Sequence, residues 1–343
     1  MVTAGQKREA APAAVVETCP RAIPSERPEA DTDVSPQLLP TPIARPAALR
    51  GAGLATDNLS RAVLYMMFAA LLIPLLNASA KYLGRHYPVL EITWARYAGH
   101  FFYMLIAFAP RRGARLLVAS RPVLQLVRST LLCLSTLIFI SALYYVPLPV
   151  ATAISFTGPF MVTALSPLLL GESVGGRRWA AVGIGFIGAL VIVRPGVGGV
   201  PTAAFLLFAS AAASALYQIL TRKLAAHDAA ETSITYIALA GFVLTTIPLP
   251  FVWKTPESAL DALVFVSLGI FGGFGHYFLV RAFELAPAPF VSPFNYGQLL
   301  GATLLSYAVF AQVPDLWTWV GASIIVASGI FMLYAERRHA PRR

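Results

Sequence analysis

Long apolar blocks alternate with short polar breaks along this chain, from about residue 62 to residue 335. Each block has about 20 residues, the length that an α-helix needs to cross the hydrocarbon core of a bilayer. The breaks, among them 86–88, 110–113 and 175–178, carry proline, glycine or charged residues typical of turns. The pattern predicts ten membrane-spanning helices, at residues 62–83, 89–109, 122–145, 149–170, 176–194, 201–221, 232–253, 260–282, 288–310 and 315–335.

The composition agrees with lipid as the main solvent. Residues of the set AVILMFWYC make up 57% of the chain and charged residues only 12%, against about 25% charged in an ordinary soluble domain. The two cysteines, Cys19 and Cys133, lie far apart, and no Cys/His spacing suits a zinc ion. We therefore expect an all-α integral membrane protein without a metal or cofactor.

The first 60 residues have a different character. They hold eight of the 26 prolines, mixed charges and no long apolar run, which is typical of a disordered segment. No apolar core of a signal peptide is present, and Val2 stands where N-myristoylation needs glycine. We predict an uncleaved, disordered cytoplasmic tail at residues 1–60.

The net charge of +10 raises the question of nucleic acid. If both termini are cytoplasmic, sixteen basic residues near helix ends fall on the cytoplasmic side and four on the outer side. This is the positive-inside bias of a membrane protein, so Arg178 and Arg222 are interpreted as topology determinants and no nucleic-acid partner is expected. The prediction is a multi-pass protein of the cytoplasmic (inner) membrane with both termini in the cytoplasm.

A repeat with an offset of 140 positions relates the two halves of the chain. It pairs Pro147 with Pro287, Pro149 with Pro289 and Trp179 with Trp319. Because five helices are an odd number, the second half must enter the membrane from the opposite side, as in the inverted repeats of secondary transporters. We predict two inverted five-helix repeats, at residues 61–195 and 196–336, and a basic cytoplasmic C-terminus at residues 337–343.

The fourth predicted helix carries a stripe of polar and aromatic residues within an arc of about 100°. The ninth helix repeats this stripe, and both copies predict a cavity between the halves. The alternative for each hydroxyl is a bond to a carbonyl of its own helix or to a neighbouring helix. The stripe consists of Thr152, Ser155, Phe156, Pro159, Thr163 and Ser166, and its copy of Ser292, Asn295, Tyr296, Gln298, Thr303 and Ser306.

Several motifs recur in both halves. They are the segment 142–147 with Pro159, Glu172, Trp179, Gly183 and Gly188, and the segment 282–287 with Trp319, Gly321 and Gly329. Over residues 62–336 the chain resembles the EamA family of the drug/metabolite transporter superfamily. The resemblance implies transport of small metabolites, in either direction, and implies that Asn77, Tyr217 and Gln218 lie around a central cavity. Gln312 replaces the glutamate found at Glu172, and Leu299 replaces the proline found at Pro159, so the second half need not hinge or pair as the first does.

Two ionisable residues inside the apolar blocks are candidates for contact with a substrate or a proton. Arg96 is the deepest cation, and the resemblance supports an arginine at this place. Attraction of an anionic group, snorkelling, and pairing with Glu91 or a carbonyl remain open for it. His276 follows Gly272, Gly273 and Gly275, and is either a packed histidine or a proton carrier.

The predicted function is a secondary transporter that moves a small organic metabolite, such as an aromatic amino acid, a vitamin or a drug-like compound, by alternating access. A proton is a candidate coupling ion, and the alternative is a membrane scaffold or regulator that acts through the tail. The chain has no HExxH or P-loop motif, and we expect no enzyme. The predicted substrate-binding residues are Asn77, Arg96, Ser155, Phe156, Tyr217, Gln218, His276, Asn295, Tyr296 and Gln298, and the predicted gating or structural residues are Pro147, Pro159, Glu172 and Pro287.

Overall fold

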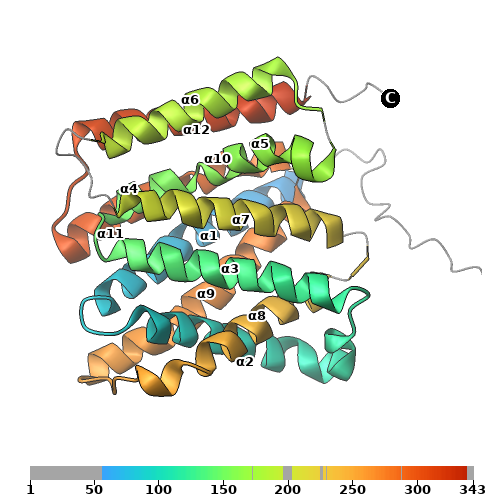
Figure 1. Cartoon of the computed structure of the whole chain (residues 1–343), viewed down its shortest axis with the longest axis vertical. Helices are drawn as coiled ribbons and strands as arrows, with labels where there is room; N and C mark the ends of the chain where they lie inside the picture. Colours follow the sequence, from blue (N-terminus) through green and yellow to red (C-terminus); the bar gives the residue numbers. More distant parts are fainter. Residues whose placement is uncertain are drawn as a thin grey trace, which may run out of the picture. The chain divides into compact units, whose positions relative to one another are not determined.

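The computed structural model describes residues 56–171, 173–195, 203–224, 227–228, 230–286 and 288–337. Nearly all of the predicted tail, together with Glu172 and Pro287, lies outside the described residues. The described residues form α-helices and short 3₁₀ turns and contain no strand (Figure 1). The α-helices are α1 (Thr56–Leu83), α2 (Val89–Arg112), α3 (Pro122–Leu143), α4 (Leu148–Ser155), α5 (Gly158–Leu170), α6 (Gly176–Val193), α7 (Ala204–Leu224), α8 (Ala230–Thr246), α9 (Ala259–Leu285), α10 (Ala288–Asn295), α11 (Gly297–Phe310) and α12 (Leu316–Arg337).

These helices occupy the ten predicted apolar blocks. Within the described part of the chain, eight helical stretches are long and apolar enough to cross a membrane. The other two expected crossings, 89–109 and 288–310, are helical as well. The first carries Arg96 and His100 within its length, which lowers its hydropathy.

The fourth and ninth blocks are both interrupted near their middle. The break after α4 falls at Phe156 and Thr157, and the break after α10 falls at Tyr296. At each break the backbone forms bonds of the tighter i→i+3 kind, such as Thr157 N–H to the Ile154 carbonyl at 2.9 Å and Tyr296 N–H to the Pro293 carbonyl at 3.3 Å. A proline accompanies both breaks, Pro159 at the start of α5 and Pro293 inside α10. The second half is thus interrupted although Leu299 replaces the proline there.

Helices from the two halves pack against one another throughout the bundle. α1 packs along α9, α3 along α7, α2 along α8, and α6 along α12 (Figure 1). The backbones of α2 and α9 approach closely, because a Cβ atom added to Gly99 would lie 2.2 Å from the Cα atom of Gly269. Glycine is required at such a contact, which lets two helices touch along their main chains.

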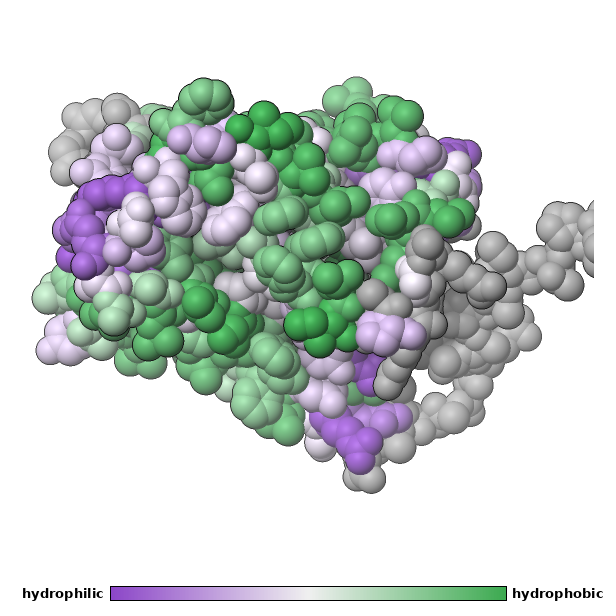
Figure 2. All heavy atoms as spheres, turned by 90° about the horizontal axis from the view of Figure 1, so that it is seen from below, coloured by the Kyte–Doolittle hydropathy of each residue, from purple (hydrophilic) through white to green (hydrophobic). Residues whose placement is uncertain are grey.

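The face of the molecule drawn in Figure 2 is largely apolar over its middle. Figure 2 shows hydrophobic residues over the central part of the visible face, with hydrophilic residues gathered toward its two ends. Many large apolar side chains among the described residues are exposed, for example Ile106 at 76%, Leu168 at 82% and Leu304 at 69%. Apolar patches of this extent are normally covered in a soluble protein, so this surface suits lipid contact.

Candidate functional site

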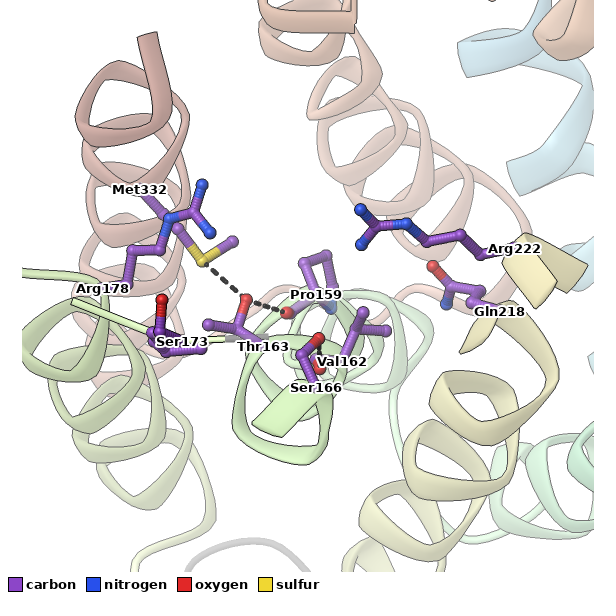
Figure 3. Close-up of a pocket in the computed structure, with 10 residues that line it drawn as sticks. Pro159, Val162, Thr163, Ser166, Ser173, Arg178, Gln218, Arg222 and Met332 are labelled. Atoms are coloured by element: carbon purple, nitrogen blue, oxygen red, sulfur yellow. Dashed lines mark hydrogen bonds between the residues drawn. The ribbon is translucent and has the colours of Figure 1, made fainter. Parts of the chain in front are cut away.

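A pocket of about 620 Å³ opens at one end of the bundle, between α5, α6, α7 and α12. In Figure 3 the hydroxyl of Thr163 lies near the centre of this pocket, with Arg178 and Arg222 on either side. The two guanidinium groups come from α6 and α7 and extend toward each other across the pocket (Figure 3). The lining residues are Pro159, Val162, Thr163, Ser166, Ser173, Val174, Arg178, Gln218, Arg222 and Met332.

The predicted polar stripe contributes one wall of this pocket. Thr163 donates to the Pro159 carbonyl at 3.0 Å and contacts the Met332 sulfur at 3.3 Å, and Ser166 donates to the Val162 carbonyl at 2.8 Å. Both hydroxyls therefore bond within their own helix, as the alternative interpretation held, and both also line the pocket. Ser155 makes the same kind of bond, to the Ala151 carbonyl at 2.8 Å, on the other side of the break.

The aromatic residues of the two stripes meet at the helix breaks. The rings of Phe156 and Tyr296 pack edge to face, with centroids 4.9 Å apart. The Tyr296 hydroxyl lies against α12, because a Cβ atom added to Gly329 would lie 1.9 Å from it. Asn295 accepts a hydrogen bond from the side-chain amide of Gln298 across the second break. Phe156 and Tyr296 thus pack against each other at the breaks, and Asn295 and Gln298 form a hydrogen bond beside them.

A third group of predicted residues lies between α2 and α9. Arg96 contacts Nε2 of His276 through its guanidinium at 3.2 Å, and the His276 ring stacks on His100 with centroids 6.5 Å apart. Glu91, considered as a partner for Arg96, instead accepts the backbone N–H of Lys254 at 3.1 Å. Arg96 therefore pairs with the histidine and not with that carboxylate.

The remaining predicted residues are dispersed. Gln218 lies in the pocket, whereas the Tyr217 ring lies under the guanidinium of Arg128 at 5.4 Å. Asn77 is half-buried on α1. Pro147 caps the start of α4, and its carbonyl accepts the N–H of Ala151 at 3.1 Å. Glu172 and Pro287 belong to the residues that the structure does not describe.

Sequence reasoning missed six lining residues and one histidine. Arg178 and Arg222 look like ordinary basic residues at helix ends, and nothing marks Val162, Ser173, Val174 or Met332 as special. His100 sits four positions after Arg96, a spacing that places both on one face of a helix. That spacing is the signal that would have identified it. No group of His, Cys, Asp and Glu that could hold a metal ion occurs among the described residues.

The opposite end of the bundle is held together by contacts of basic side chains. Lys81 of α1 donates to the carbonyls of Leu143 and Val146 at 2.8 and 2.6 Å. Its ammonium group and the guanidinium of Arg85 lie over the ring of Phe310 in α11, at 5.6 and 5.1 Å from the centroid. At the same end, Arg194 after α6 pairs with Asp315 before α12.

Curated relatives of the chain are membrane transporters. It is 29% identical to the S-adenosylmethionine uptake transporter of Rickettsia prowazekii, over 76% of this chain and 88% of that protein. It is 30% identical to the riboflavin transporter of Rhizobium johnstonii, over 81% and 94%. It is 26% identical to the pseudopaline exporter of Pseudomonas aeruginosa, over 80% and 96%.

A solved structure shares the fold. It is described only as the crystal structure of a protein, has a TM-score of 0.57 and 21% identity, and is matched over 82% of this chain and 99% of its own length. The model of the EamA-like transporter family matches twice, at residues 60–194 and 201–334. The chain is therefore a multi-pass membrane protein that belongs to the EamA-like transporter family, within the drug/metabolite transporter superfamily.

Proposed function

We propose that this protein is a secondary transporter of a small organic metabolite that works by alternating access and has no enzymatic activity. The observation that carries the proposal is the contrast between the two ends of one bundle. A pocket with polar walls opens at the end that holds Arg178 and Arg222, while Lys81, Arg85 and Phe310 join helices at the other end. A transporter that exposes its site to one side at a time needs this asymmetry in each of its states.

The helix pairs support ten crossings arranged as two inverted repeats. If α1 corresponds to α7, and α3 to α9, then the contact of α1 with α9 has its counterpart in the contact of α7 with α3. The contact of α2 with α9 likewise corresponds to that of α8 with α3. The two interrupted helices, α4–α5 and α10–α11, occupy equivalent positions. Interrupted helices at the repeat interface are typical of secondary transporters.

The orientation that we propose places the pocket on the cytoplasmic side of the inner membrane, because most basic residues at helix ends share that side. Single cysteines at Arg111 and at Arg337 should then react with a membrane-impermeant reagent only from the cytoplasm. Labelling of the two positions from opposite sides would contradict ten crossings.

The substrate class can be identified by a direct uptake screen. The purified full chain, reconstituted into liposomes, should accumulate at least one member of a mixture of amino acids, vitamins, nucleosides and sulfonium compounds, measured by mass spectrometry against empty liposomes. Riboflavin and S-adenosylmethionine belong in the mixture, because relatives carry these names. Absence of saturable uptake of any compound, with and without an imposed proton gradient, would contradict the proposal.

The residues at the helix breaks are proposed to contact substrate as it passes between the halves. Asn295→Ala removes the acceptor for Gln298 and should reduce transport while leaving the unfolding temperature nearly unchanged, because both amides can bond to water instead. Tyr296→Phe is the matched test at the neighbouring ring, since it keeps the edge-to-face contact with Phe156. Loss of stability with wild-type transport in both variants would make the group structural.

Truncation of the N-terminal tail distinguishes the transporter from the scaffold alternative. Removal of residues 1–55 should leave transport intact if the bundle alone carries the function. Loss of transport in a correctly inserted truncation would favour a regulatory tail instead.

A further inference from the structure

We propose that His276 binds a proton during the transport cycle, and that this proton and the hydrogen bond from Arg96 exclude one another at the same ring nitrogen. The proposal rests on the proposed transport function and deepens it, because it names the coupling ion and the atom that binds it. Arg96 belongs to α2 and His276 to α9. Ionisable side chains within apolar helices are costly and normally face a partner or a water-filled space.

The first argument is the direction of the hydrogen bond between the two side chains. Nη2 of Arg96 lies 3.2 Å from Nε2 of His276. A guanidinium group has donors only and keeps its charge in proteins, so the histidine nitrogen must be the acceptor. Nε2 therefore holds a lone pair and no proton in this conformation, and the ring proton is on Nδ1.

The second argument is the set of titratable groups that the packed helices bring to His276. Helices α1, α2 and α10 pack against α9. From α2, Arg96 and His100 face His276, and the His100 ring lies nearly parallel to the His276 ring, with centroids 6.5 Å apart. Helix α1 has no titratable residue between Tyr65 and Lys81, and α10 has none. The neighbours from other helices are thus one fixed cation and one neutral or cationic ring.

Helix α9 itself places no carboxylate near this histidine. Tyr277 is the next residue and Arg281 lies five positions on, whereas Asp261 lies 15 positions before His276 and Glu284 lies 8 positions after it. Eight positions correspond to about 12 Å along a helix axis. A proton on Nε2 would place an imidazolium directly against the guanidinium group, and like charges at this distance repel. The proton and the contact therefore exclude each other.

The third argument is the position of the contact between the two halves of the chain. Helix α2 lies in the first family match and α9 in the second. Glycines of α9 face α2 here, because a Cβ atom added to Gly272 would lie 3.8 Å from Cγ of Arg96, and one added to Gly273 would lie 3.5 Å from the uncharged ring of Tyr103. No side chain at these positions blocks sliding of the helices. Movement of the halves against each other, as alternating access requires, then separates Arg96 from His276.

The exchange of partners at Nε2 needs water alone. When the halves bring Arg96 to His276, the proton on Nε2 passes to water and the guanidinium group donates in its place. When they separate, Nε2 accepts a proton from water. Arg96, His100 and His276 are each half-buried and not enclosed. Histidine is suited to this exchange because its unperturbed charge change lies near neutral pH.

The first experiment observes the ring of His276 without any substrate. The full chain with ¹⁵N-labelled histidine is reconstituted into liposomes, and solid-state NMR records the ring nitrogens between about pH 5 and pH 8, a range that spans the ordinary titration of histidine. The signal of His276 is identified by its absence in H276Q. We expect the neutral form with the proton on Nδ1 at pH 7 in the wild type. At about pH 6 the protonated fraction should be at least threefold larger in R96Q, and R96K, which keeps a cationic donor, should match the wild type within twofold.

Two spectra would overturn the proposal. One is a wild-type ring with its proton on Nε2 at neutral pH, and the other is an equal protonated fraction in the wild type and R96Q. If R96Q does not insert into the membrane, the transport measurement below decides the question.

The second experiment measures uptake of each compound that the liposome screen identifies, with a proton gradient imposed in either direction. The ratio of uptake with and without the gradient should differ from one by at least threefold in the wild type and should fall to about one in H276Q. A merely structural loss would lower both rates and leave this ratio unchanged. H86Q is the matched control, because His86 is an exposed histidine outside the helices, and it should keep the wild-type ratio.

The outcomes separate the proton site from the transporter proposal. Transport that no proton gradient affects, or a gradient response that persists in H276Q, would overturn the proton site and leave the transporter standing. If no compound is transported, the transport proposal fails, and the NMR comparison of the wild type with R96Q alone decides whether Arg96 and a proton compete for His276.

Discussion

The two ends of the bundle use basic residues in opposite ways. At one end, Lys81 donates two hydrogen bonds to carbonyls at and after the end of α3. At the other end, Arg178 and Arg222 face a pocket that their own helices help to form. Basic side chains therefore join helices at one end of the bundle and line a pocket at the other.

The closed end has a simple physical cause. The last carbonyls of a helix have no partner within that helix, and Leu143 is the last residue of α3. Lys81, only 7% exposed, supplies donors to this carbonyl and to that of Val146. A cation also interacts favourably with the negative end of the helix dipole. One buried lysine thus joins α1 to the end of α3 while it lies over Phe310 of α11.

The largest effect is expected from Lys81→Met. The substitution keeps the length of the side chain but leaves two carbonyls without their donor, which should cost about 2–3 kcal/mol of stability. A loss of about 1.4 kcal/mol in the closed contacts alone changes the balance between two states about tenfold, so transport in proteoliposomes should fall by at least that factor. Lys254→Met is the control, because that lysine is 44% exposed at the same end and should have a small effect. Wild-type transport and stability in Lys81→Met would mean that the end is closed by apolar packing instead.

The open end is tested by a pair of threonines at equivalent positions of the two halves. Thr163 and Thr303 both donate to a carbonyl four residues earlier, at 3.0 and 2.9 Å. Of the two, Thr163 is among the residues that line the pocket. Thr163→Val should therefore raise the KM for the transported solute about fivefold, since one hydrogen bond contributes about 1 kcal/mol, and Thr303→Val should leave it unchanged. Equal KM values for the Thr163→Val and Thr303→Val variants would mean that the solute does not contact Thr163.

A group of hydrogen bonds around Asp228, which we call the Asp228 clamp, lies beside the open end and should affect stability but not transport. Asp228 accepts the Ser120 N–H at 2.7 Å and the Gln125 amide at 2.8 Å. Burial raises the pKa of this carboxyl, but the hydrogen bonds from Ser120 and Gln125 outweigh it and hold the pKa below 3.8. The clamp therefore contributes stability at neutral pH, and the contribution is lost as the pH falls through the lowered pKa.

Asp228→Asn should lower stability at pH 7 by about 1 kcal/mol and should have a smaller effect at about pH 3. Thermal unfolding in detergent at the two pH values measures this, and Glu257→Gln, 59% exposed at the other end, serves as the control. A larger loss at the acidic pH than at neutral pH would contradict the sign of the effect.

The positions of the helices could be predicted from the sequence, whereas the shape of the site could not. Apolar blocks of about 20 residues fix where helices form because lipid allows few alternatives, and the stripe of Pro159, Thr163 and Ser166 does reach the pocket. The break at Tyr296 was not predicted, because Leu299 replaces the proline that marks the first break. Arg178 and Arg222 were assigned to topology because the direction of a long basic side chain depends on its neighbours in space.

The smallest effect is expected at the pair of Arg194 and Asp315, which links the ends of α6 and α12 on the closed side. Burial raises the pKa of Asp315, but hydrogen bonds from Thr318 and the charge of Arg194 outweigh burial and leave the pKa below its usual value. The pair is therefore intact at neutral pH and is lost as the pH falls through the lowered pKa. The Asp315 side chain is 43% exposed, and exposed ion pairs contribute about 0–1 kcal/mol.

Asp315 has a second role, because it also accepts the Thr318 N–H at 2.9 Å and so caps the start of α12. Asp315→Asn keeps an acceptor for this cap and removes only the charge, so it should change the unfolding temperature and the transport rate by less than a third of the Lys81→Met effect. Asp315→Ala removes the cap as well and should cost about 1 kcal/mol. A double-mutant cycle of R194Q with D315N isolates the ion pair, and its coupling should be smaller at about pH 3 than at pH 7. If that coupling instead matches the Lys81→Met effect, the pair and not Lys81 is the main contact that closes this end.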